Sequence, residues 1–340
     1  SALQSALPGN YIRISGLAFD QADNLWVTLT DVNHLLCVRQ PNGSWTSFQF
    51  PGFGPGTRVW DVIIDDSGNK WILLPGNGIL VFNDNGTIDN KTDDQSIRLI
   101  NAAGSGNLPN KDVVSIVKDL DGEIWVGTNQ GIAVFYSPES VFSGSNFDAS
   151  QILIEQDGYF QYLLEFESVT AIAVDGANRK RIGTENAGEF LKSPDGTEEL
   201  LHFTKNNSPL LSDNILSIAI NQQNGEVFFG TEAGLVSYKS TATEGGKKNE
   251  NVYAYPNPVR EGYSGLIAIK GLVKNATVKI TDISGTLIYS TAALGGQAIW
   301  DGKNFEGEKA HSGIYLVFIS NDDGSENFLG KVNVAVSASC

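Results

Sequence analysis

Histidine, cysteine and serine are the residue types whose spacing would most directly indicate metal binding or catalysis. The three histidines are His34, His202 and His311, and they lie far apart, with no HxxxH or Cys-His spacing. Zinc sites usually show such short spacings, and no GxSxG nucleophile elbow is present either. A site assembled from distant residues would leave no such signal. We therefore predict no catalytic residue, no metal and no cofactor.

Carboxylates are the other candidate for chemistry. Residues 1–250 hold 31 Asp and Glu, and any two of them could converge to cleave a glycosidic bond, so a carbohydrate-active protein remains an open alternative. The formal net charge is −16, and nearly all of the acidic excess lies in this region, because residues 251–340 carry 7 basic and 8 acidic residues. An acidic surface repels phosphate backbones, so nucleic acid is not expected as a partner.

The elements that would position such residues come from a repeat. The stretch EIWVGTNQGIAVF, from Glu123 to Phe135, has partial copies at spacings of 45, 54, 56 and 47 residues, which is near the length of a propeller blade. The copies place one residue each at an anchor position: Trp26, Trp71, Trp125, Arg181 and Phe228. We interpret this position as packing one blade on the next. The fourth copy has an arginine there and lacks the turn glycine, so we expect its blade to be the least regular.

The repeats have the pattern of antiparallel strands. Apolar residues alternate with a period of two, and the runs end in Asp, Asn and Gly clusters that suit hairpin turns. We therefore predict an all-β fold: a β-propeller whose five visible repeats either close alone or belong to a larger propeller set. Residues 136–168 form a long insertion, which we interpret as an outer hairpin of a blade rather than a separate element; a loop that makes contacts is the alternative.

The pattern changes after the fifth repeat. Residues 240–251 are polar and lack apolar periodicity, and beyond them short alternating strands indicate an Ig-like antiparallel β-sandwich. We predict a propeller at 1–243, a linker at 244–251, the sandwich at 252–336 and a tail at 337–340.

Both parts carry family resemblances. The pattern from Val114 to Gly131 resembles the two-component-regulator type of β-propeller repeat. The segment after residue 251 resembles a type IX secretion C-terminal sorting domain, through YPNPV, WDGKNFEG, SGIYLV and a final KVNV. The residues that carry this resemblance are Tyr255, Pro256, Asn257, Pro258, Gly285, Trp300, Asp301, Gly302, Gly307, Gly313, Tyr315 and Lys331.

These motifs also have structural interpretations. The two prolines fix an extended entry that cannot join a central ladder, and the glycines supply turns. Gly313 is expected at a tight corner before the next strand. Trp300 and Tyr315 are interpreted as core or rim aromatics.

Together the two resemblances suggest a cell-surface component of the type IX secretion system, exported across the outer membrane. Such a protein would work with the sortase and outer-membrane barrel partners of an attachment complex that swaps the cargo's sorting domain for anionic lipopolysaccharide. The resemblance implies a non-enzymatic protein that binds or delivers the lipopolysaccharide. Candidate contacts are five lysines, whose alternative is ordinary solvation: Lys270, Lys274, Lys279, Lys303 and Lys309.

Two other functions share these features. In one, the chain is secreted cargo, and its C-terminal domain is only an address that is removed at the surface. In the other, the repeats belong to a periplasmic sensor, which would require a transmembrane helix and a kinase downstream. The sequence ends in the sorting-type domain instead.

Overall fold

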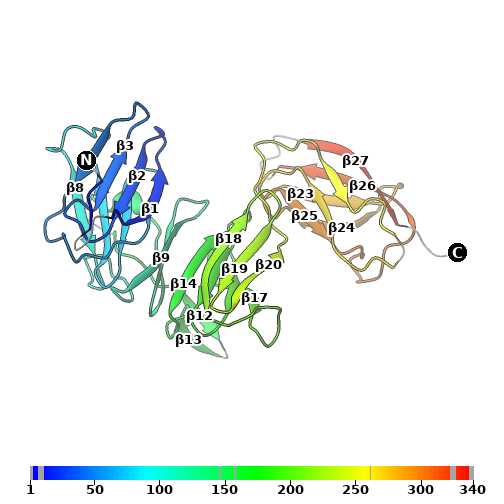
Figure 1. The fold of residues 1–340 in the computed structure, drawn as a ribbon. Helices are drawn as coiled ribbons and strands as arrows, with labels where there is room; N and C mark the ends of the chain where they lie inside the picture. Colours follow the sequence, from blue (N-terminus) through cyan, green and yellow to red (C-terminus); the bar gives the residue numbers. More distant parts are fainter. Residues whose placement is uncertain are drawn as a thin grey trace. The chain divides into compact units, whose positions relative to one another are not determined.

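A computed structural model describes residues 3–6, 11–144, 147–156, 158–260, 262–321 and, for the backbone, 327–336. The described chain is built of antiparallel strands, with one short 3-10 helix, η1, at Pro138–Ser140 (Figure 1). No helix within these ranges has the length and apolar character needed to cross a membrane.

Each of the five repeats folds as one antiparallel sheet whose strands follow the chain order. The first two sheets have four strands each: β1 Ile14–Phe19, β2 Leu25–Leu29, β3 Leu36–Arg39 and β4 Trp45–Phe48, then β5 Val62–Ile64, β6 Lys70–Leu74, β7 Gly78–Asn83 and β8 Gln95–Leu99. The third sheet has three strands: β9 Val113–Lys118, β10 Ile124–Thr128 and β11 Gly131–Phe135. The fourth and fifth comprise β14 Val169–Val174, β15 Lys180–Thr184, β16 Glu189–Lys192 and β17 Glu199–Phe203, then β18 Ile215–Asn221, β19 Glu226–Thr231 and β20 Gly234–Lys239. The five sheets are the blades of the predicted propeller.

The cores lie between successive blades. One apolar cluster joins the first and second sheets, another the second and third, and a third the third and fourth. The strands that carry the anchor positions of the second, third and fourth repeats are buried along their whole length. This burial explains the near-continuous apolar sequence of β6 and β10, because both faces of each strand are covered. In β15 the buried Lys180 and Arg181 are held in ion pairs instead.

The insertion between the third and fourth repeats forms a separate two-stranded hairpin, β12 Leu153–Gln156 with β13 Tyr159–Tyr162. It is not an outer strand of either flanking blade, since its two strands pair only with each other in the sheet order. The insertion is therefore a hairpin, but the expectation that it belongs to a blade was wrong, because its strands form a sheet of their own.

The C-terminal region has two sheets, as expected for a sandwich. One has the order β21-β22-β25 and the other β24-β23-β26-β27. The strands are β21 Tyr253–Tyr255, β22 Ile267–Lys270, β23 Thr277–Thr281, β24 Leu287–Ala292, β25 Gln297–Trp300, β26 Gly313–Ser320 and β27 Asn327–Val336. Alternate residues of β22, β23 and β26 form one apolar core, in which Trp300 is the largest side chain.

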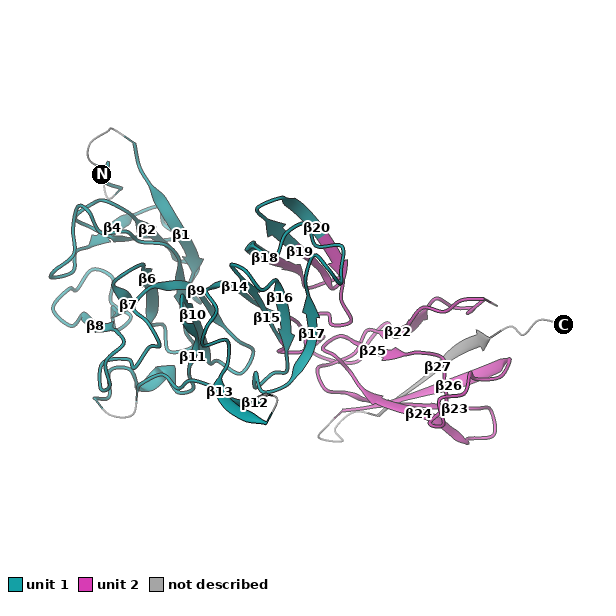
Figure 2. Ribbon diagram, turned by 90° about the horizontal axis from the view of Figure 1, so that it is seen from below, with its two compact units in different colours: residues 1–174, 180–218, 229–236 teal, residues 175–179, 219–228, 237–340 magenta. Residues whose placement is uncertain are grey.

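The chain divides into two compact units (Figure 2). The first comprises residues 1–174, 180–218 and 229–236. The second comprises the sandwich, residues 237–252 before it, the turn 175–179 of the fourth repeat, and residues 219–228 of the fifth, which form the turn between β18 and β19 with the adjoining ends of both strands. These turns were assigned to the propeller in the sequence analysis; in the structure they pack in the same unit as the sandwich.

Candidate functional site

In the first two repeats, the repeated aspartate closes a turn and orients the anchor tryptophan. In the second repeat, Asp65 Oδ1 accepts hydrogen bonds from the amides of Ser67 and Asn69, and Oδ2 accepts from Asn69 Nδ2 and Trp71 Nε1, both at 2.8 Å. Asp20 holds Trp26 in the same way at 2.8 Å. Burial acts to raise the pKa of Asp20, but the hydrogen bonds from the turn and the indole lower it below its ordinary value.

The tryptophan anchors lie between blades. Trp26 of the first blade contacts Phe82 of the second, with ring centroids 6.2 Å apart, and Trp71 of the second contacts Phe135 of the third at 4.9 Å. Trp125 lies in the cluster between the third and fourth blades and, like the other two, is fully buried. These contacts agree with the interpretation of the anchor as an inter-blade residue.

The last anchor position is arranged differently. Phe228 is only partly buried, whereas its neighbours Val227 and Phe229 are buried. The fifth blade thus turns the residues on either side of the anchor position inward. The repeat alignment could not reveal this change, because all three residues are apolar.

The fourth repeat replaces the aromatic anchor by ion pairs. Arg181 Nη1 lies 2.7 Å from Glu189 Oε1, and both side chains are fully buried. In the turn, Asn178 adopts a φ of 62° and so takes the role of the missing glycine. The expectation of a least regular blade was wrong, because the fourth sheet has all four strands. The charge of Arg181 is paired with Glu189, and Asn178 supplies the positive φ of the turn.

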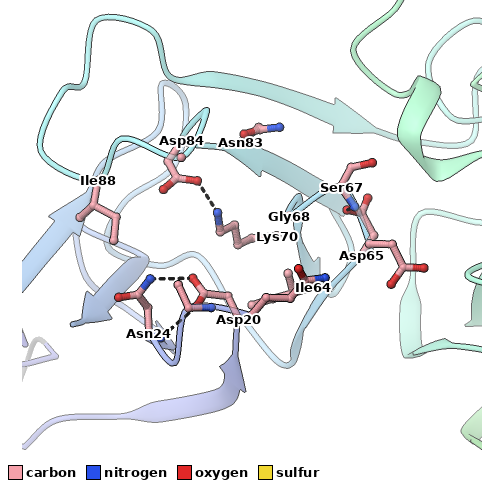
Figure 3. A pocket seen from close by; sticks show the side chains of 14 residues that line it. Asp20, Asn24, Ile64, Asp65, Ser67, Gly68, Lys70, Asn83, Asp84 and Ile88 are labelled. Carbon is pink, nitrogen blue, oxygen red and sulfur yellow. Dashed lines mark hydrogen bonds and ion pairs between the residues drawn. The ribbon is translucent and has the colours of Figure 1, made fainter. Parts of the chain in front are cut away.

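A pocket of about 280 Å³ lies at the turn end of the first two blades (Figure 3). Its centre is the buried Lys70, which forms an ion pair with Asp84 and lies 4.1 Å above the ring of Trp26. Asp20 and Asp65 also line it, and both are already engaged by the turn amides and indoles. These contacts of Asp20, Asp65 and Asp84 stabilise the repeat.

Nucleophile and metal chemistry find little support in the described ranges. His34 Nδ1 lies 2.6 Å from Ser47 Oγ, but no carboxylate contacts the imidazole to complete a triad. His202 stacks on Phe190, and His311 is exposed. No group of three or more His, Cys, Asp and Glu side chains able to hold a metal occurs among the residues described. The lack of a catalytic residue stays a prediction.

The tryptophan and tyrosine of the sorting-type motifs form one corner of the sandwich. Trp300 is fully buried, and its Nε1 donates to the carbonyl of Lys303 at 2.7 Å. Tyr315 packs edge-on against it at 5.3 Å and donates to the carbonyl of His311 at 2.6 Å. Asp301 Oδ1 accepts the amide of Lys303 and closes the turn. Folding therefore accounts for the tryptophan, aspartate and tyrosine of these motifs.

The prolines and glycines of the motifs have distinct positions. Tyr255 is 68% exposed and ends β21, the edge strand of its sheet, and the two prolines follow it through cis peptide bonds: Pro256 after Tyr255 and Pro258 after Asn257. The turn glycines have positive φ, as expected: Gly285, Gly302 and Gly307.

Two motif residues of the same domain need separate comment. Gly313 does not have positive φ, and a Cβ there would meet no atom within 4 Å, so the structure shows no steric need for glycine. Lys331 lies in β27, whose side chains are outside the described residues.

The five candidate lysines do not form one patch. Lys270 on β22 and Lys279 on β23 alternate with core residues, so they lie on the outer faces of different sheets. Lys303 and Lys309 are brought opposite each other by a β-bridge, and Lys303 also lies 3.7 Å from Asp301. Lys274 lies between β22 and β23. A role for any of them in binding stays a prediction.

The sequence analysis did not predict how the chain after the fifth repeat contacts the sandwich and the turn of the fourth repeat. A Cβ on Gly176 or Gly295 would lie 1.9 Å from the carbonyl oxygen of Thr243, and one on Gly296 would lie 2.1 Å from that of Glu244. Three glycines thus let the chain after the fifth repeat pass between a blade turn and the sandwich. The sequence feature that could have indicated this close contact is the glycine pair at 295–296, because it lies in a region otherwise rich in strand-forming residues.

Family matches agree with this architecture. Residues 253–331 match the family described as secretion system C-terminal sorting domain, and residues 107–130 match the two component regulator propeller. The extracellular domain of a hybrid two-component system from B. thetaiotaomicron has a similar fold, with 20% identity, a TM-score of 0.50, and coverage of 92% of this chain and 38% of that one. The chain is a β-propeller protein that carries a C-terminal sorting domain.

One solved structure is similar along almost the whole chain. It is PorZ, a bacterial surface component of the type IX secretion system of Porphyromonas gingivalis, with 32% identity and a TM-score of 0.69 over 99% of this chain. The chain spans 46% of the length of PorZ. No curated protein sequence matches the chain. The resemblance to PorZ and the sorting domain relate this protein to type IX secretion.

Proposed function

We propose that the protein is a non-enzymatic accessory component of type IX secretion. It acts at the cell surface, on the extracellular side of the outer membrane, with the sortase and the outer-membrane barrel partners of the attachment complex. There it binds or delivers anionic lipopolysaccharide. The similarity to PorZ and the sorting domain support this role, and the alternative is secreted cargo whose sorting domain is removed.

The observation that carries the proposal is the attachment of the sorting domain to the rest of the second unit. Gln297 Nε2 donates to the carbonyl of Thr241 at 2.7 Å, and the amide of Gly296 donates to that of Thr243 at 2.9 Å. Parallel bridges join Thr243 to Gly295 and Gly246 to Val273. The chain around the start of the predicted linker, residues 241–246, is thus hydrogen-bonded through its backbone to the sandwich.

The turn segments strengthen the same attachment. The amide of Glu244 donates to the carbonyl of Gln222 at 2.7 Å, and Arg179 Nη1 donates to Thr241 Oγ1 at 3.2 Å. Ala242 and Thr243 are buried. A domain that serves only as a removable address needs an accessible segment for cleavage, because a protease binds an extended and unpaired chain. The hydrogen-bonded junction instead favours a retained domain.

The test is the intact mass and C-terminal peptide of the native protein taken from the cell surface. We expect residues 251–336 to remain attached. Anionic lipopolysaccharide binding would then be measured on the full chain, with Lys303→Gln and Lys309→Gln together as the variant. Lys111→Gln, at an exposed lysine of the repeat region, is the control. A native chain that ends near Asn251 with a glycolipid adduct would overturn the proposal in favour of cargo.

A further inference from the structure

A second pocket, of about 340 Å³, lies in the first compact unit between the inserted hairpin and the fourth blade. The hairpin β12–β13 and the loop after it form one wall, and strands β16 and β17 form the other. Phe190 and His202 stack with ring centroids 4.0 Å apart and also line it. The pocket is absent from the regular repeat, because its first wall belongs entirely to the insertion.

The charge of this pocket is negative. Its ionisable side chains are Glu165, Glu167, Glu199 and Lys192, together with a histidine. Lys192 is buried, and its Nζ lies 3.2 Å from Glu199 Oε2, so its charge is already balanced. Glu165 Oε2 accepts a neutral hydrogen bond from the amide of Tyr162 at 3.2 Å. The two carboxylates of the loop therefore leave an excess of negative charge in the pocket.

Large aromatic side chains of the hairpin and of the loop after it face solvent, and two of them line the pocket. Phe166 of the loop is 85% exposed, and Tyr162, which lines the pocket beside it, is 42% exposed. On the hairpin, Tyr159 and Phe160 are 77% and 72% exposed. Aromatic residues in such numbers on one short segment mark an interaction surface, since their exposure gains nothing for folding. Their ring faces also attract cations.

We propose that this pocket binds a lysine or arginine side chain from an extended segment of a protein partner, while apolar residues beside that cation cover the exposed rings of the hairpin. The carboxylates of Glu165 and Glu167 would receive the cation, and Phe166 would lie against it. The same charge disfavours phosphate and anionic glycolipid, so this site is distinct from the lipopolysaccharide contacts proposed above. The inference rests on the pocket alone and does not depend on the proposed function.

The experiment measures binding of a fluorescein-labelled peptide, Ser-Leu-Arg-Phe-Arg-Ser, to the full chain by fluorescence anisotropy at low ionic strength. The matched probe replaces each arginine by citrulline, which keeps the shape and removes the charge. We expect the citrulline peptide to bind about tenfold more weakly, because it loses both the ion pair and the cation–π attraction. Glu165→Gln with Glu167→Gln should weaken the arginine peptide by a similar factor.

Two further variants keep the test decisive. Phe166→Ala alters a side chain that is 85% exposed, so it leaves the fold intact and should still weaken the arginine peptide. Glu139→Gln, an exposed glutamate of the same unit outside the pocket, should leave binding unchanged. Equal binding of the two peptides, or no loss in the pocket variants, would overturn the proposal. So would binding of maltohexaose that Phe166→Ala abolishes while the arginine peptide fails to bind.

Discussion

Lys180 Nζ lies 2.7 Å from Asp119 Oδ2, with both side chains fully buried, and 4.4 Å above the ring of Trp125. Lys70 lies in the equivalent place above Trp26. In both cases a lysine that directly precedes one anchor position covers the anchor tryptophan of the preceding repeat. The buried cations are therefore part of how the second and fourth blades pack on the first and third.

Removing one member of this pair should be costly. Lys180→Met leaves the Asp119 carboxylate buried without its cation, and we expect a loss of about 3–5 kcal/mol in the free energy of unfolding. The double change Lys180→Met with Asp119→Asn should recover a large part of that loss. Urea unfolding of the two single variants and the double variant measures the coupling. Additive losses would show that the pair contributes no interaction of its own.

The ion pair between Lys180 and Asp119 also makes the stability of the fold depend on pH. Burial acts to raise the pKa of Asp119, but the hydrogen bond and charge of Lys180 and the amides of Asp121 and Glu123 hold it below its ordinary value of 3.8. A depressed carboxyl pKa contributes stability that is present above the unfolded value and is lost as pH falls through the folded one. Asp119→Asn should therefore flatten the fall in melting temperature below about pH 4. An unchanged acid profile would contradict this assignment.

The repeat fold was readable from the sequence because its signals are local. The aspartate six residues before Trp26 and Trp71 accepts a hydrogen bond from the indole within a local turn, and alternating apolar residues specify the strands. The sorting-type motifs were readable for the same reason, since Trp300 and Tyr315 close a single corner.

The features that were missed depend on distant parts of the chain. Gly176 and Gly295 meet at Thr243 only in the folded protein, and the acidic pocket needs the hairpin loop to lie against strands β16 and β17. Polar composition predicted a linker at 244–251, but composition carries no information about backbone hydrogen bonds to other segments. Local periodicity cannot specify such contacts.

Arg181 at an anchor position gives a second stability test. Arg181→Trp restores the repeat pattern but leaves Glu189 buried without the guanidinium, so we expect a loss of about 3–5 kcal/mol. Adding Glu189→Leu should return most of this stability, because the site then resembles the other blades. Thermal and urea unfolding of both variants compare the two cases. A stable single variant would mean that the ion pair is dispensable for packing.

Cys37 should be unreactive in the folded protein. It is fully buried in β3, and burial raises the pKa of its thiol to about 12, although Lys91 acts in the opposite direction. The reactive thiolate is therefore scarce at pH 8. In a Cys340→Ser variant, we expect a thiol reagent such as DTNB to label Cys37 only after denaturation. Rapid labelling of the folded chain would show that the first blade opens readily.

The junction that supports a retained sorting domain can be tested by one methyl group. Gly176→Ala places a Cβ 1.9 Å from the Thr243 carbonyl oxygen, so the chain must shift, and we expect a loss of about 1–3 kcal/mol. The displaced segment should also be cut faster by trypsin at the exposed Lys247 and Lys248. Gly313→Ala is the matched control, because its Cβ meets nothing within 4 Å.

Calorimetry and timed trypsin digestion of the wild type and both variants measure these two effects. Faster cleavage in Gly176→Ala alone would show that the hydrogen bonds of the junction protect the segment that a surface protease would need to reach. Equal cleavage of all three proteins would mean that the segment is already open. The hydrogen-bonded junction would then no longer support the proposal that the sorting domain is retained.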